Sequence, residues 1–148
     1  MTANKRKRGK RYFTAAEANA TLPLVRRIAQ DITELAVSLR ERHERLSRLS
    51  GGSGRGVMGD AYQEEMQTLQ DDLDRAQGQM KDYVQELQSL GVELKDYYTG
   101  LVDFPAWMNG HEVYLCWRLG EPEVGHWHEL DAGFAGRQKL SAEEVHSN

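Results

Sequence analysis

Residues 101–119 read LVDFPAWMNGHEVYLCWRL, and this stretch decides how the C-terminal half of the chain folds. Strand-forming residues flank Asn109-Gly110 on both sides, in two runs of nearly equal length. Asn-Gly suits a two-residue turn in which both central residues adopt positive φ. The stretch therefore predicts an antiparallel β-hairpin with strands over residues 101–108 and 111–119.

A two-residue turn also fixes which residues face each other. One face of the hairpin is predicted to be apolar and to cover the core, and it pairs Met108 with His111, Ala106 with Val113, Phe104 with Leu115 and Val102 with Trp117. The opposite face pairs Trp107 with Glu112, Pro105 with Tyr114, Asp103 with Cys116 and Leu101 with Arg118. A slip of one residue would invert the faces, and only this register separates them by polarity. Asp103 and Arg118 become diagonal neighbours, close enough for an ion pair.

A third strand is predicted over residues 124–130, where His126 and His128 lie two positions apart and point the same way. A three-residue loop, Gly120 to Pro122, places His126 opposite Cys116 and both histidines on the face of Asp103. A four-residue loop turns both histidines to the core face instead. Both loop lengths are common in hairpins, and the sequence does not choose between them.

Upstream of the hairpin the hydrophobic period is helical. Residues 60–90 carry an unbroken heptad-like stripe, and residues 22–49 carry a similar one. The first segment has a net charge of +2 over residues 22–49, and the second has −6 over residues 59–90. A glycine-rich connector, residues 50–59, lies between them. We therefore expect a long antiparallel, coiled-coil-like helical hairpin, followed by a small antiparallel β-meander: an α+β fold.

The N-terminal boundary has its own signals. Thr14 and Glu17 fit a capping box, which predicts a short helical turn, and Thr21-Leu22-Pro23 is a second start signal for the long helix. The predicted organisation is a disordered basic arm over 1–11 and a single α+β domain over 12–137. Within that domain the helical hairpin covers 14–90 and the β unit 91–137, and a tail follows over 138–148.

The composition of the chain narrows the partners and the compartment that we expect. Residues 5–11, KRKRGKR, carry six positive charges on a chain whose net charge is −4. Nothing else forms a basic reading face, so we do not expect a nucleic-acid partner. Apolar runs are too short for a membrane span, and no signal peptide is evident. The single cysteine, Cys116, suits a reducing compartment, so a cytoplasmic protein is expected.

Three blocks carry a family resemblance: YFTAAEANATLPLVR from residue 12, GVELKDYYTGLVDFP from residue 91, and EVYLCWRLGEPEVGHWHELDAGFAGR from residue 112. They resemble the uncharacterised bacterial family catalogued as domain of unknown function 2203. The resemblance covers roughly residues 12–137. It implies no activity, substrate or catalytic residue, and it marks the second half of the chain as the distinctive part.

The first candidate site is a metal site. His126 and His128 form an H-x-H pair on a strand, and imidazole suits divalent transition metals. Cys116, Asp103, Glu129 or Asp131 could complete the set. The competing interpretation makes both histidines structural, with hydrogen bonds to carbonyls or carboxylates beside Trp127.

The second candidate is a small polar ligand site with Asp103, Arg118, Asp131 and Arg137. Its two arginines would clamp a carboxylate or phosphate beside the glycine-bearing loop 131–137. The competing interpretation is a loop whose glycines only turn the chain, since no phosphate-loop signature is present. A thiolate–imidazole pair at Cys116 is also conceivable, but a cysteine in an apolar run is more often a buried small hydrophobe.

The leading functional hypothesis is a non-enzymatic binding or interaction module with this polar pocket on its β unit. Two helices bury only one stripe each, so a homodimer through the helical hairpin is expected. The alternative is a metal-binding protein or metal-dependent enzyme that uses His126 and His128. Neither the ligand nor a reaction follows from the sequence.

Overall fold

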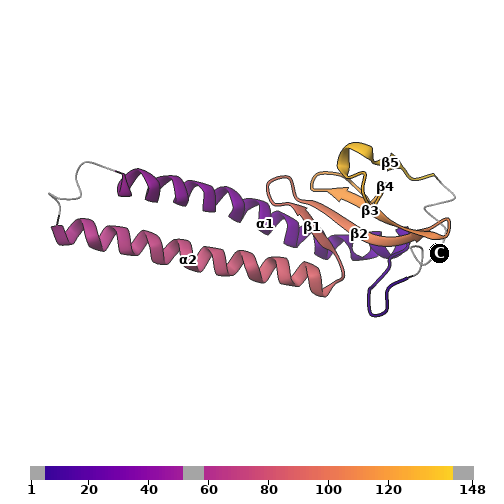
Figure 1. Cartoon of the computed structure of the whole chain (residues 1–148), viewed down its shortest axis with the longest axis horizontal. Helices are drawn as coiled ribbons and strands as arrows, with labels where there is room; N and C mark the ends of the chain where they lie inside the picture. Colours follow the sequence, from indigo (N-terminus) through magenta and orange to yellow (C-terminus); the bar gives the residue numbers. More distant parts are fainter. Residues whose placement is uncertain (1–5, 52–58, 142–148) are drawn as a thin grey trace.

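The computed structural model describes residues 6–51 and 59–141 and has an α+β fold. Two long helices precede a five-stranded antiparallel sheet with the strand order β1-β2-β3-β4-β5. The elements are α1 (Ala15–Ser50), α2 (Gly59–Ser89), β1 (Glu93–Asp96), β2 (Leu101–Met108), β3 (His111–Arg118), β4 (His126–Glu129), the short 3-10 helix η1 (Phe134–Gly136) and β5 (Gln138–Lys139). Figure 1 shows the two helices side by side, extending well beyond the sheet. The predicted helical hairpin and meander are confirmed.

The first helix begins earlier than the long helix predicted from residue 22. Thr14 and Glu17 form the expected capping box, but α1 then continues through Pro23 without a break. The proline removes one helical hydrogen bond, at a cost of about 3 kcal/mol. Leu22 and Val25 are buried on either side of it, and each such side chain contributes roughly 1.5–3 kcal/mol. The burial of these two side chains beneath the sheet therefore offsets the free-energy cost of the proline.

The seam between the helices is where the heptad stripe predicts it. Leu73, Ala76, Met80 and Leu87 are the buried residues of α2. Among the described residues no ion pair joins the two helices, so the opposite net charges act without specific contacts. The polar contacts across the seam instead include bonds from Arg42 to the Asp72 carbonyl and from the Tyr62 hydroxyl to the Leu49 carbonyl, and a side-chain contact of 3.3 Å between Gln77 and His43. Most of the predicted connector, residues 52–58, lies outside the described residues.

The sheet has the predicted register. Asn109 and Gly110 have φ values of 51° and 81°, and all eight predicted pairs of β2 and β3 occur, from Met108 with His111 to Leu101 with Arg118. Between β3 and β4, Cys116 lies opposite His126 and Tyr114 opposite His128. This is the register of the three-residue loop. The paired part of β4 is shorter than the predicted strand, because the ladder stops at His126.

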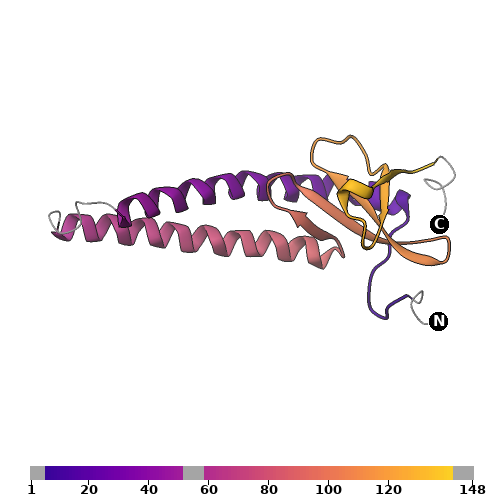
Figure 2. The ribbon, with the colours of Figure 1, turned by 45° about the horizontal axis from the view of Figure 1, so that its top comes forward.

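The core lies between α1 and the inner face of the sheet. Phe104, Leu115 and Trp117 are almost fully buried there, together with Val25 and Ile32 of α1. Figure 2 shows α1 running along the sheet while β4 and β5 lie on the side away from α2. The outer face of the sheet is also closed, since Asp103 and Cys116 are buried.

Both ends of the described chain contact the sheet. Residues 138–139 form β5 on the edge of β4, and Leu140 is buried with its N–H donating to the Gly125 carbonyl. At the other end, residues 1–5 lie outside the described residues. The rest of the basic arm folds back on the sheet, where Lys10 forms an ion pair with Glu112. No helix in the described part of the chain is long and apolar enough to cross a membrane.

Candidate metal centre

Three adjacent strands bring three different metal-ligand types together on the outer face of the sheet. Asp103 comes from β2, Cys116 from β3 and His128 from β4. One ligand atom from each residue lies within 4.8 Å of the other two. The three residues are 2%, 0% and 2% exposed, respectively. A carboxylate, a thiol and an imidazole thus share one buried site.

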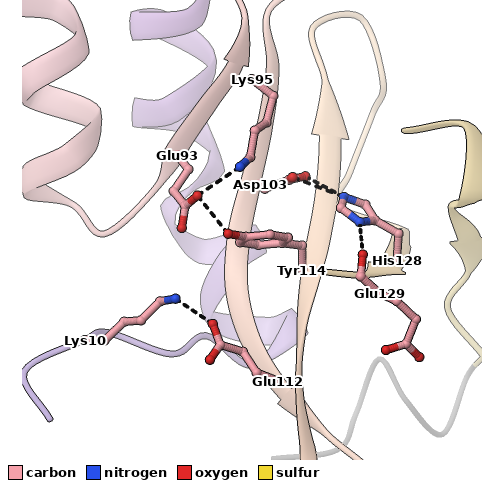
Figure 3. Close-up of polar contacts among 8 residues, drawn as sticks. All are labelled: Lys10, Glu93, Lys95, Asp103, Glu112, Tyr114, His128 and Glu129. Atoms are coloured by element: carbon pink, nitrogen blue, oxygen red, sulfur yellow. Dashed lines mark hydrogen bonds and ion pairs between the residues drawn. The ribbon is translucent and has the colours of Figure 1, made fainter. Parts of the chain in front are cut away.

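His128 is held in a defined orientation by both of its ring nitrogens. Nδ1 lies 2.7 Å from the backbone carbonyl of Glu129, and Nε2 lies 3.1 Å from each carboxyl oxygen of Asp103 (Figure 3). A carbonyl oxygen can only accept, so Nδ1 carries a proton and donates it. The bond at Nδ1 leaves Nε2 as the ring nitrogen that faces the cluster. Metal-ligating histidines are commonly fixed in this way by an outer hydrogen bond.

Burial opposes negative charge in the cluster. It raises the pKa of Asp103, although the His128 contact offsets part of the increase. Burial and the nearby Asp103 carboxylate raise the pKa of the Cys116 thiol to about 12. Burial thus disfavours the ionised form of both groups, which is the ordinary behaviour of buried acids. A divalent cation would reverse this preference, because metal binding displaces protons from its ligands.

His126 is not part of the three-residue cluster, so the predicted His126–His128 pair is not formed as a unit. Alternate residues of a strand share a face but are separated by about 6.6 Å along it. Nδ1 of His126 is buried and has no hydrogen-bond partner among the described residues, and it lies 4.0 Å from a carboxyl oxygen of Glu121. His126 nevertheless lies directly opposite Cys116.

The predicted ligand residues are only partly assembled. Arg137 reaches the Cys116 thiol and forms a two-pronged ion pair with Glu121. Burial raises the pKa of Glu121, but the contacts with Arg137 and with the Arg118 backbone outweigh it, so the pKa lies below its ordinary value.

The other predicted members lie apart from the cluster. Arg118 is exposed and lies over the Phe134 ring, so the expected ion pair with Asp103 is wrong. Asp131 is exposed in the loop after β4. Among the described residues, the predicted arginine clamp is therefore not formed.

A second polar row, which was not predicted, lies beside the cluster. The Tyr114 hydroxyl and Lys95 both donate to Glu93, at 2.9 and 3.0 Å, as Figure 3 shows. The Tyr114 ring also packs against His128, with 5.5 Å between the ring centroids. Burial and the Glu93 contact raise the pKa of Tyr114. The signal was available, since pairing β1 with β2 in register sets Glu93 opposite Asp103.

Comparison with known proteins identifies a family. The model of DUF2203, described as an uncharacterized conserved protein, matches residues 11–140. The chain belongs to the DUF2203 family. The match spans both helices and the whole sheet, so the cluster of Asp103, Cys116 and His128 lies inside the family domain. No curated protein and no solved structure matches this DUF2203 chain.

Proposed function

We propose that this DUF2203 protein binds a divalent transition metal of the zinc type through Asp103, Cys116 and His128. One observation carries the proposal: three ligand atoms of three kinds lie within 4.8 Å of one another at a buried site. The hydrogen bond from His128 Nδ1 to the Glu129 carbonyl supports it, because it leaves Nε2 as a metal ligand.

The ligand types favour one class of metal. Thiolate and imidazole suit zinc and its neighbours, whereas magnesium and calcium prefer oxygen ligands throughout. Three protein ligands leave a fourth tetrahedral position for water or another side chain. His126 is the natural fourth candidate, because its buried Nδ1 has no hydrogen-bond partner in the described part of the chain and it lies opposite Cys116.

A structural pair is the competing explanation for the same geometry. A buried Asp103–His128 contact would hold β2 and β4 in place around β3 without any metal. The two explanations differ at Cys116, which a structural pair does not require. They also differ in whether a metal raises the stability of the folded protein, as any ligand that binds only the native state must.

The test is a cobalt titration of metal-free protein purified without a histidine tag. Wild type should bind one Co²⁺ per chain and develop a thiolate-to-cobalt charge-transfer band together with the intense visible bands of tetrahedral cobalt. Cys116→Ala should lose the charge-transfer band, and His128→Ala should abolish tight binding. His43→Ala, on α1 and outside the three-residue cluster, is the matched control and should bind cobalt as wild type does.

His126→Ala separates three ligands from four. If His126 is a ligand, this variant should bind cobalt more weakly and with an altered visible spectrum. Failure of wild type to bind cobalt stoichiometrically would contradict the proposal. So would a charge-transfer band that survives Cys116→Ala.

The cellular compartment and the oligomeric state of the protein are also proposals. We propose a cytoplasmic protein, consistent with its single buried cysteine, and a homodimer formed through the helical hairpin as a coiled-coil-like assembly. Exposed Leu24 and Val37 on α1 support association, because a second copy would remove them from water.

A further inference from the structure

A groove of about 400 Å³ lies where the helical hairpin meets the β1–β2 turn. Ala36 and Leu39 of α1 and Met80 of α2 form its apolar floor. Tyr97 and Tyr98 of the turn form its outer wall. None of these residues belongs to the proposed metal centre, so the groove is a separate feature of the molecule.

The backbone of the turn that carries the two tyrosines is held by hydrogen bonds, although their rings are exposed. One carboxyl oxygen of Asp96 accepts from the backbone N–H groups of Tyr98 and Thr99, at 2.8 and 3.3 Å. Gly100 then closes the turn at a φ of 67°, and a Cβ at this position would lie 2.8 Å from Cβ of Leu119. The turn can therefore adopt this path only with glycine, and it fixes the two tyrosines against α1.

The exposure of the tyrosines requires an explanation. Tyr97 is 47% exposed and Tyr98 is 54% exposed, so both present substantial aromatic surface to solvent. Within the described part of the chain, neither hydroxyl has a hydrogen-bond partner. Two preplaced rings with free hydroxyls beside an apolar floor match the composition of small-molecule sites.

The charge of the groove selects the ligand. Its lining includes the basic side chains of Arg40 and His43 and no acidic residue, on a chain with a net charge of −4. The acidic helix α2 contributes only Gln77 and Met80. The Arg40 guanidinium lies over the Tyr98 ring, 5.1 Å from its centroid, and forms no ion pair among the described residues. Its N–H edge remains available to an anion.

We propose that this groove binds a small amphipathic carboxylate, meaning a carboxylic acid with an aromatic or aliphatic body. The carboxylate pairs with Arg40, whose planar fork matches its geometry. The apolar body packs on Leu39 and Met80 and against the tyrosine rings. The volume is within the usual range of ligand pockets, about 300–1,000 Å³. The proposal does not depend on the metal centre.

The experiment compares two probes of the same shape. Binding of 2-naphthoate and of uncharged 2-naphthalenemethanol is measured by their fluorescence, with metal-free and metal-loaded protein. We expect saturable 2-naphthoate binding that is unaffected by metal and at least about tenfold tighter than binding of the alcohol, since a charge-assisted hydrogen bond is lost in the alcohol.

Arg40→Gln removes the charge and keeps a polar but shorter side chain, and it should weaken 2-naphthoate binding about tenfold while leaving binding of the alcohol unchanged. Arg45→Gln, one turn further along α1, is the matched control and should bind as wild type. Equal affinities for the two probes would overturn the proposal, as would an unaltered Arg40→Gln variant. If instead the tyrosine fluorescence changes when the protein is diluted and 2-naphthoate does not compete with this change, a second copy of the chain covers the groove and the proposal is wrong.

Discussion

Replacing Asp103 by Asn and by Ala should have clearly different effects on the metal-free protein. The Nδ1–H of His128 already donates to the Glu129 carbonyl, so a ring that is neutral needs a hydrogen-bond donor at Nε2. An Asn side chain can supply an N–H across the 3.1 Å that separates Nε2 from the Asp103 oxygens, and it removes a buried acid. Alanine leaves Nε2 buried and unpaired, which costs about 1–3 kcal/mol.

The expected size of the difference follows from these contacts. Asp103→Asn should unfold within about 1 kcal/mol of wild type, whereas Asp103→Ala should lose about 2 kcal/mol. For a chain of 148 residues, 2 kcal/mol corresponds to a fall in Tm of roughly 4–8 °C. Both variants should lose metal binding, because neither an amide nor a methyl group replaces a carboxylate ligand well.

The pH dependence provides a second readout of the same substitution. Burial raises the pKa of Asp103 above its ordinary 3.8, so the folded state holds a proton that the unfolded state releases. The stabilising contribution of this protonation is present below pH 3.8 and is lost as the pH rises through the raised pKa. Asp103→Asn should remove this decline with pH.

The assay is urea unfolding followed by circular dichroism, in the presence of a chelator and at several pH values. The two variants and wild type are compared on the same day with the same buffers. If Asp103→Asn is destabilised as much as Asp103→Ala, then Nε2 of His128 does not present a lone pair to position 103. That result would refute the assigned ring orientation and, with it, the second line of support for the metal centre.

Three further predictions concern the rest of the fold. Leu73→Asp places an unpaired charge in the seam between the helices and should cost about 3 kcal/mol, so a variant that melts like wild type would show that the seam is wrong. Because the pKa of Glu121 is lowered, its ionised carboxylate stabilises the fold above pH 4.5, and this contribution is lost as the pH falls through the lowered pKa. Glu121→Gln should therefore flatten the acid side of the stability curve measured by urea unfolding, and an unchanged acid side would contradict the pairing with Arg137. Light scattering should show a dimer at tens of micromolar protein, and a monomer there would remove the proposed hairpin-to-hairpin assembly.

Much of the site geometry was accessible from sequence because the turn of the first hairpin fixes its register. Once Asn109-Gly110 is a two-residue turn, the facing of Asp103 and Cys116 follows by counting. The second register was a choice between two loop lengths, and the structure has the one that brings His126 opposite Cys116. The counting therefore identified the correct face of the sheet.

Counting along strands could not show which histidine joins the cluster. His126 and His128 share a face, but only side-chain packing decides that His128 reaches Asp103 across β3 while His126 is directed toward Glu121. Local rules also misplaced the start of the long helix at Pro23, because the compensating burial of Leu22 comes from the sheet, far along the chain. Tertiary contacts overrode the local signal in both cases.

The central claim is that Asp103, Cys116 and His128 hold a zinc-type metal, and anomalous diffraction tests it most directly. Crystals grown with equimolar zinc should give one strong anomalous peak at the zinc edge in each chain, within bonding distance of all three side chains. The distances should be about 2.3 Å to sulfur and about 2.0–2.2 Å to nitrogen and oxygen. Zinc bound elsewhere on the chain, or no zinc at this site when the protein is crystallised with it, would contradict the account.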